Sequence, residues 1–193
     1  MTMENGETIR SFIAVELSGE AREELARIIG ILKRAEADVK WMSPGSIHLT
    51  LKFLGDITAE KATLVAGRLK EIAAGIRPFR LVLGGIGVFP GWGHARVLWV
   101  GVSDGEKEAK ELARSVEEEM AREAFEREDR AFSPHLTLGR VRTGKNKDKL
   151  KDLADSIDVV PAPSLISRIV LFRSVLTREG SIYTPLDITD LGK

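Results

Sequence analysis

The chain of 193 residues contains no cysteine. Disulfide bonds, thiolate metal sites and cysteine nucleophiles are therefore excluded. No apolar run reaches the roughly 18 residues that a membrane-spanning helix needs. The first ten residues (MTMENGETIR) also lack the apolar core of a signal peptide. We therefore expect a cytoplasmic protein without a membrane segment.

The chain also lacks an excess of charge, since 29 basic residues balance 29 acidic ones. A protein that coats itself with nucleic acid non-specifically is normally basic, so this class is disfavoured. A locally basic cleft remains compatible with zero net charge. Apolar residues make up 43% of the chain, which is enough at this length for one compact domain with two lobes.

Only three histidines occur in the chain, and two of them lie in the same four-residue string, His-Leu-Thr-Leu. The copies start at His48 and His135, and polar and apolar residues alternate in both, which is typical of a strand with one buried face. Side chains two positions apart on a strand share a face. The motif therefore places each histidine beside a threonine, Thr50 or Thr137. Two similar strands without chemistry are one interpretation; we prefer two imidazoles and two hydroxyls that converge on one cleft.

The spacing of the two strings indicates an internal repeat. His48 and His135 are 87 residues apart, and the same shift moves Ile13–Val15 onto Val100–Val102. We therefore predict an α+β fold in which two pseudo-symmetric β-α-β-α-β lobes place antiparallel sheets around a central cleft, with the helices outside. One domain (1–193) would contain a first lobe at about 8–88 and a second at about 95–188, joined by the turn-rich segment 89–94.

Capping residues and apolar periodicity predict the helices and strands. One helix is expected to start at Ser18 or Gly19, and a second to start after Thr58. A third is expected over about 106–125, with Ser103 and Glu106 as its capping box. A short helix is expected to hold Leu150, Leu153 and Ile157. Besides the two histidine strands, strands are predicted over residues 9–17, 39–41, 79–88, 96–102, 166–176 and 181–187.

The paired His-x-Thr-x strings resemble the 2H phosphoesterase superfamily, and within it the RNA 2′,3′-cyclic phosphodiesterases, also called 2′-5′ RNA ligases. The likeness covers roughly residues 8–188, and its segments are 10–15 (RSFIAV), 47–55 (IHLTLKFLG), 96–99 (RVLW), 132–140 (FSPHLTLGR) and 180–183 (GSIY). The resemblance implies a monomeric hydrolase without a cofactor. Its substrate would be RNA or an oligonucleotide, tRNA fragments included, whose 2′,3′-cyclic phosphate end is opened to a 2′-phosphate. The reverse reaction would be 2′-5′ ligation.

The residue types suit such chemistry. Imidazole acts as acid or base near neutral pH, so His48 and His135 are the candidate catalytic pair. The Thr50 and Thr137 hydroxyls are candidate phosphate ligands. The resemblance adds Arg140 as a third ligand, although its odd spacing from His135 requires a strand end or a bulge. Without an evident ligand set, a metal is not required.

Other interpretations remain open. The chain would alternatively be a 2H esterase for small cyclic nucleotides or ADP-ribose cyclic phosphate, or a non-catalytic nucleotide- or RNA-binding module. Lys52 is in register with His48, which predicts a place at the cleft edge. The aromatic residues Phe53, Trp99 and Tyr183 are expected in the core, although the resemblance allows one of them to line a nucleotide pocket. His94 is expected in an exposed loop.

Overall fold

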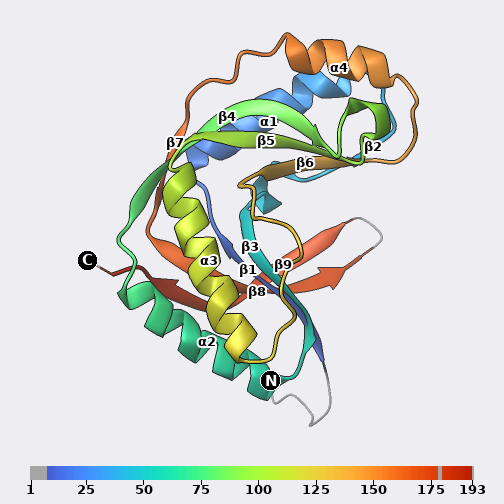
Figure 1. Ribbon diagram of the computed structural model, residues 1–193. Coiled ribbons are helices and arrows are strands. Elements are labelled where there is room, and N and C mark those ends of the chain that lie inside the picture. Colours follow the sequence, from blue (N-terminus) through green and yellow to red (C-terminus); the bar gives the residue numbers. More distant parts are fainter. Residues whose placement is uncertain (1–7, 178–179, 193) are drawn as a thin grey trace.

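The computed structural model describes residues 8–177 and 180–192, which form two antiparallel β-sheets facing each other (Figure 1). Sheet A has the strand order β3-β1-β8-β9. Its strands are β1 (Ile9–Val15), β3 (Leu49–Ile57), β8 (Arg168–Leu176) and β9 (Ser181–Asp190).

Sheet B has the order β2-β6-β5-β4-β7, so its edges are two short strands. Its strands are β2 (Val39–Trp41), β4 (Phe79–Phe89), β5 (Val97–Asp104), β6 (Leu136–Val141) and β7 (Pro163–Ile166). The sequence did not predict β7, because two prolines at residues 161 and 163 indicate a break in the chain. Its place at the sheet edge is one where a strand tolerates proline.

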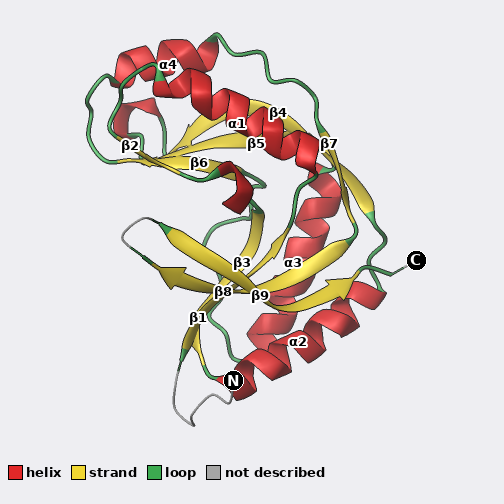
Figure 2. Cartoon of the chain, turned by 180° about the vertical axis from the view of Figure 1, so that it is seen from behind, coloured by secondary structure: helices red, strands yellow, loops and turns green. Residues whose placement is uncertain are grey.

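Four helices lie on the outer sides of the two sheets within the described residues (Figure 2). The helices α2 (Ala59–Ala74) and α3 (Glu106–Arg122) pack beside sheet A, where α2 contacts β8 and β9 and α3 contacts β3. The helices α1 (Gly19–Lys33) and α4 (Lys147–Asp155) contact each other beside sheet B. Two antiparallel sheets with external helices confirm the predicted fold class. No helix in the described part of the chain is long and apolar enough to cross a membrane.

The two sequence repeats exchange elements between the sheets. In residue number, a shift of 87 places β1 on β5, α1 on α3, β3 on β6 and β4 on β8. However, β4 pairs with β5 in sheet B, and β8 pairs with β1 in sheet A. The chain therefore does not divide between the sheets at the predicted boundary between 88 and 95. One repeat alone offers two paired strands, which are marginally stable, so each repeat completes the sheet of the other.

The helix starts show which capping predictions hold. The Ser18 hydroxyl accepts a hydrogen bond from the amide of Ala21, and the Thr58 hydroxyl accepts one from Lys61, so both predicted caps are confirmed. The predicted capping box at Ser103 is wrong. Strand β5 continues to Asp104, and the Ser103 hydroxyl donates to the Leu83 carbonyl instead.

The main core lies between the sheets and the helices, and a second cluster covers the opposite face of sheet A. This second cluster consists of Phe12, Ala14, Val170 and Phe172, with Tyr183 packed against it. Strand β1 is buried almost throughout because its two faces meet different apolar layers. Sheet A therefore presents an aromatic surface on the side that faces away from its helices.

Candidate active site

His48 lies one residue before β3, and the backbone anchors its ring. The Nδ1 atom is 2.8 Å from the carbonyl oxygen of Ser46. A carbonyl oxygen only accepts hydrogen bonds, so Nδ1 carries the proton in the neutral ring. The lone pair of the neutral imidazole is therefore on Nε2, the atom that can accept a proton from a substrate or a water molecule.

His135 repeats this arrangement one residue before β6. Its Nδ1 atom is 2.8 Å from the carbonyl oxygen of Ser133. The same argument places the lone pair of neutral His135 on Nε2. Both copies of the His-x-Thr string therefore have the backbone contact that sets the tautomer of the histidine.

Aromatic rings surround the His48 imidazole. Its ring stacks on Phe12 at 4.6 Å between centroids and meets Tyr183 edge-on at 5.1 Å. Burial among these rings penalises the imidazolium and lowers the pKa of His48 to about 4, while the hydrogen bond to Ser46 opposes the shift. In the free protein His48 is therefore neutral at pH 7.

The ring of His135 has a single aromatic neighbour among the described residues. The Phe89 ring lies edge-on to the imidazole at 5.0 Å, and it packs in turn on Trp99, also at 5.0 Å. Trp99 packs against Gly87, where a β-carbon would clash with the indole. Glycine at this position therefore lets Trp99 and Phe89 support the His135 ring.

A β-bulge in β3 decides which side chains of the first motif face the cleft. Thr50 pairs with Ala14 and Lys52 pairs with Ile13, so Leu51 has no partner in β1. An extra residue reverses the alternation of the strand beyond it. Phe53, rather than Lys52, therefore shares the face of Thr50.

This bulge overturns two predictions. Lys52 is not at the cleft edge: it is 2% exposed and its Nζ lies 2.7 Å from Glu117 of α3. The same ammonium donates to the carbonyl of Glu126. Phe53 is not a core residue: it is 58% exposed and lines the cleft. Tyr183 also lines the cleft, whereas Trp99 is half-buried.

A second bulge occurs at the equivalent position of β6. Gly139 pairs with Leu98 and Thr137 pairs with Trp99, which leaves Leu138 without a partner in β5. The alternation reverses here too, so Arg140 shares the face of Thr137. This is the geometry that the odd spacing between His135 and Arg140 required. Because 87 residues separate the two positions, Arg140 is the counterpart of Phe53.

The two sheets enclose a cleft of about 870 Å³. His48, Thr50, Thr137 and Arg140 all contribute to its lining, whereas His135 is not among the lining residues. Arg10 and Lys40 line it as well, and no aspartate or glutamate among the described residues does so. Within the described residues, a chain of zero net charge thus has a cleft lined by three cations, which favours an anionic ligand.

Sequence reasoning missed Phe12 and Lys40, which both line this cleft. Phe12 lies in an apolar run that gives no sign of which residues face a ligand. Lys40 pairs with Arg140 through β2 and β6, and this pairing of distant segments has no local signal. His94, in contrast, is exposed as predicted.

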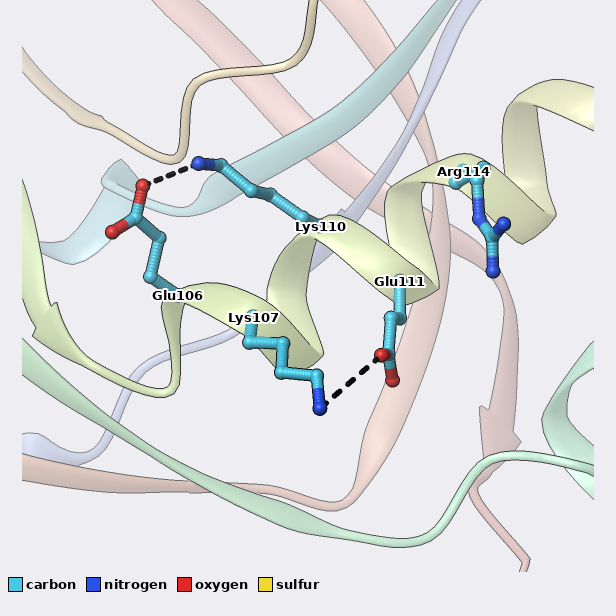
Figure 3. A pocket seen from close by; sticks show the side chains of 5 residues that line it. All are labelled: Glu106, Lys107, Lys110, Glu111 and Arg114. Carbon is cyan, nitrogen blue, oxygen red and sulfur yellow. Dashed lines mark ion pairs between the residues drawn. The ribbon is translucent and has the colours of Figure 1, made fainter.

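A second hollow lies on α3 and has a different character (Figure 3). It is lined by Glu106, Lys107, Lys110, Glu111 and Arg114. Lys110 pairs with Glu106 at 2.6 Å, and Lys107 lies 4.0 Å from Glu111. All five side chains come from one helix and the pairs have (i, i+4) spacing, so this is a solvated helix face. Residues 8–177 and 180–192 contain no group of three side chains placed to hold a metal ion.

The fold and the paired motifs define a 2H phosphoesterase. The family model described as LigT like Phosphoesterase matches the chain twice, over residues 15–99 and 100–183. The chain therefore belongs to the LigT-like phosphoesterase family, and the resemblance inferred from the sequence is confirmed. The two matches also support the internal repeat.

Relatives from archaea and bacteria share most of the chain. A protein named RNA 2′,3′-cyclic phosphodiesterase from Methanothermobacter thermautotrophicus is 38% identical over 93% of this chain and 97% of its own length. A protein of the same name from Escherichia coli is 29% identical over 92% of this chain and 93% of its own length.

Solved structures agree with this assignment. The protein TT0787 of Thermus thermophilus has a TM-score of 0.78 and 27% identity, covering 96% of this chain and all of its own. The Escherichia coli protein LigT in complex with 3′-AMP has a TM-score of 0.74 and 25% identity, covering 97% of this chain and all of its own.

Proposed function

We propose that this enzyme hydrolyses the 2′,3′-cyclic phosphate at the end of an RNA chain to a 2′-phosphate. The names of its relatives support the substrate, since they are RNA 2′,3′-cyclic phosphodiesterases at 38% and 34% identity. The observation that carries the proposal is the pair of histidines, each anchored through Nδ1 so that Nε2 can exchange protons.

The reaction needs one base and one acid. Water attacks the phosphorus, a bond forms from the water oxygen to phosphorus, and the bond from phosphorus to the 3′-oxygen breaks. The base removes a proton from the attacking water, and the acid protonates the leaving 3′-oxygen. The products are a 3′-hydroxyl and a 2′-phosphate, and the two imidazoles exchange one proton with each other through the solvent before the next turnover.

We assign His48 as the base and His135 as the acid. His48 is held neutral by its aromatic surroundings, which lower its pKa to about 4, and a neutral imidazole is the form that accepts a proton. An anionic phosphate in the cleft raises the pKa of a nearby imidazole, so substrate binding strengthens the base. The acid is then His135, whose Nε2 is the ring nitrogen left to exchange protons because its Nδ1 contacts the Ser133 carbonyl.

The phosphate ligands stabilise the negative charge that develops on the non-bridging oxygens. The hydroxyls of Thr50 and Thr137 come from opposite sheets and line the same cleft. Arg140 follows Thr137 on its face of β6 because of the bulge at Leu138. Hydrogen bonds from such donors are strongest where water is excluded.

The cleft favours an oligonucleotide end over a smaller molecule. Exposed Phe53 and partly exposed Tyr183 offer surfaces on which bases stack, and the three cations suit a phosphate backbone. Attack by a 5′-hydroxyl in place of water would give a 2′-5′ linkage in the same site, so we include reversible ligation in the proposal. tRNA fragments are one source of such ends. A cytoplasmic location and a monomeric state stay predictions from the sequence.

A substrate panel tests the proposal. Purified protein is given an oligoribonucleotide with a 2′,3′-cyclic phosphate end, a mononucleotide 2′,3′-cyclic phosphate and ADP-ribose cyclic phosphate, each with and without EDTA. We expect the oligoribonucleotide to give the highest kcat/KM, with a 2′-phosphate product and no effect of EDTA. Binding of the oligoribonucleotide without turnover would identify a binding module instead, and a higher kcat/KM on either small molecule would identify a different esterase.

A further inference from the structure

Lys40 and Arg140 lie directly opposite each other in the antiparallel pair of β2 and β6. Cross-strand partners share a face, with their Cβ atoms about 5 Å apart, and like charges in this position destabilise a sheet. Both side chains are exposed and both line the cleft. The fold therefore accepts an unfavourable pair of cations at this point of the cleft wall.

Nothing within the described residues offsets this pair. Neither Lys40 nor Arg140 forms an ion pair there, and no carboxylate from the described residues lines the cleft. The third cation of the cleft, Arg10 of β1, differs in its cross-strand neighbour, because its partner in β3 is a carboxylate residue, Asp56, although no ion pair forms between them. Among these cations only Lys40 and Arg140 face each other across strands, so an anionic ligand at this pair also offsets a like-charge contact.

The position of the pair indicates which anion it binds. Thr137 pairs with Trp99 of β5 and Arg140 pairs with Val97, so the two side chains are two strand steps apart, or about 7 Å. Lys40 lies one strand further out, which adds about 5 Å across the sheet. A phosphate held by Lys40 is therefore a different phosphate from the one at Thr137.

We propose that Lys40 and Arg140 form a second phosphate subsite, which binds the phosphodiester adjacent to the cyclic end of an oligoribonucleotide. This subsite rests on the proposed function and makes the enzyme prefer oligonucleotides to mononucleotides. The guanidinium of Arg140 has five N–H donors, enough to contact both phosphates. The counterpart of Arg140 in the other repeat is Phe53, so the residue after the bulge offers a cation to a phosphate in sheet B and a stacking surface to a base in sheet A.

Replacement of Lys40 tests whether the two phosphates are bound at separate subsites. We compare the wild type with Lys40→Gln and Lys40→Arg on a short oligoribonucleotide and on a mononucleotide, both with the same terminal base and 2′,3′-cyclic phosphate. Lys40→Gln lowers kcat/KM on the oligoribonucleotide about 5-fold more than on the mononucleotide, mainly through KM. The dependence of log kcat/KM on log salt concentration becomes shallower by about 0.7 on the oligoribonucleotide. Lys40→Arg restores both.

The control is Lys33→Gln, which removes the same charge from the end of α1, outside the cleft lining. It keeps the wild-type ratio between the two substrates. Thermal denaturation supplies a second readout, because relief of the like-charge pair leaves the Tm of Lys40→Gln equal to or above that of the wild type. A merely structural role would lower Tm and affect both substrates equally, which would overturn the subsite.

Two negative outcomes are distinguishable. If the wild type opens both substrates and Lys40→Gln keeps its preference for the oligoribonucleotide, the subsite is refuted while the proposed function stands. If the wild type opens neither substrate, the proposed function fails and the subsite fails with it.

Discussion

The two histidines have the same backbone anchor but different surroundings. In both, Nδ1 lies 2.8 Å from the carbonyl oxygen two residues earlier. His48 is enclosed by Phe12, Phe172 and Tyr183, whereas His135 has only Phe89 among the described residues. Duplication can therefore supply two imidazoles with the same anchor, and packing against aromatic rings then lowers the pKa of one of them, His48. An acid–base pair needs one neutral and one protonated imidazole, and the burial of His48 favours its neutral form.

The residues that follow the two motifs differ in the same way. The bulges at Leu51 and Leu138 are equivalent, and each brings the residue two positions further on into the cleft. That residue is aromatic Phe53 in one repeat and cationic Arg140 in the other. The same bulge therefore places a residue for stacking on a nucleobase in one wall of the cleft and a residue for binding a phosphate in the other.

Removal of either imidazole tests whether the two copies are both needed. His48→Ala and His135→Ala should each lower kcat by about 10²–10⁴-fold, which is the usual contribution of a proton-transfer group. The double variant should be no worse than the poorer single variant, because the groups act as a unit. Steady-state kinetics measure all three. His94→Ala, the third histidine, should keep wild-type activity. Turnover near the wild-type rate in either single variant contradicts the two-histidine mechanism.

The two repeats also differ at Lys52, whose counterpart in the second repeat is Gly139. Its buried ammonium pairs with Glu117, whose other oxygen accepts the amide of Glu128 in the segment that leads to His135. Lys52→Met removes the cationic partner of Glu117, which keeps only the hydrogen bond from the Glu128 amide, and should lower the free energy of unfolding by about 3 kcal/mol.

Chemical denaturation measures this loss, and Lys110→Met is the matched control. Lys110 pairs with Glu106 on the exposed face of α3 (Figure 3), so its replacement should cost a few tenths of a kcal/mol. Equal losses of unfolding free energy in the two variants would show that the buried Lys52–Glu117 pair stabilises the fold no more than an exposed pair.

The lowered pKa of His48 makes stability depend on pH. Between pH 6.5 and about 4 the unfolded chain binds a proton at His48 and the folded chain does not. The free energy of unfolding therefore falls as the pH falls through this window, by about 3 kcal/mol in total from this group. Below pH 4, His48 should cause no further fall in the free energy of unfolding. In His48→Gln this part of the dependence should vanish in denaturation curves recorded at each pH; an unchanged dependence contradicts the assignment.

Phe53 and Arg140 should differ in what they contribute to binding. Loss of a stacking surface in Phe53→Ala should weaken binding of the terminal nucleotide by about 1–3 kcal/mol and raise KM. Arg140→Gln should also lower kcat, because its donors act on charge that develops in the transition state. The kcat and KM of both variants on one oligoribonucleotide test this. A fall in kcat alone for Phe53→Ala would contradict a stacking role.

The sequence was informative where the signal was local. The alternation around His48 and Thr50 predicted a strand, and Ser18 and Thr58 predicted helix starts that the structure has. The faces of Lys52 and Phe53 were assigned wrongly, because one unpaired residue in β3 reverses every side chain beyond it. No local pattern marks such a bulge, since it depends on the partner strand.

The partners of strands from distant segments were equally inaccessible. Lys40 became a cleft residue through its pairing with Arg140, and the exchange of β4 and β8 follows from which sheet each strand completes. Neither feature can be recognised in a short stretch of sequence, because both depend on which distant strands pair. For Arg140, the resemblance to a family supplied what periodicity alone did not, and the bulge at Leu138 gives the physical reason.

NMR titration of the imidazole nitrogens shows directly whether burial holds His48 neutral with its proton on Nδ1. Three histidines make assignment by single variants practical. We expect the His48 ring to keep the Nδ1–H tautomer at pH 7 and to titrate near pH 4. A His48 midpoint at pH 6.5 or above in the free protein, or a proton on Nε2 at pH 7, contradicts this expectation.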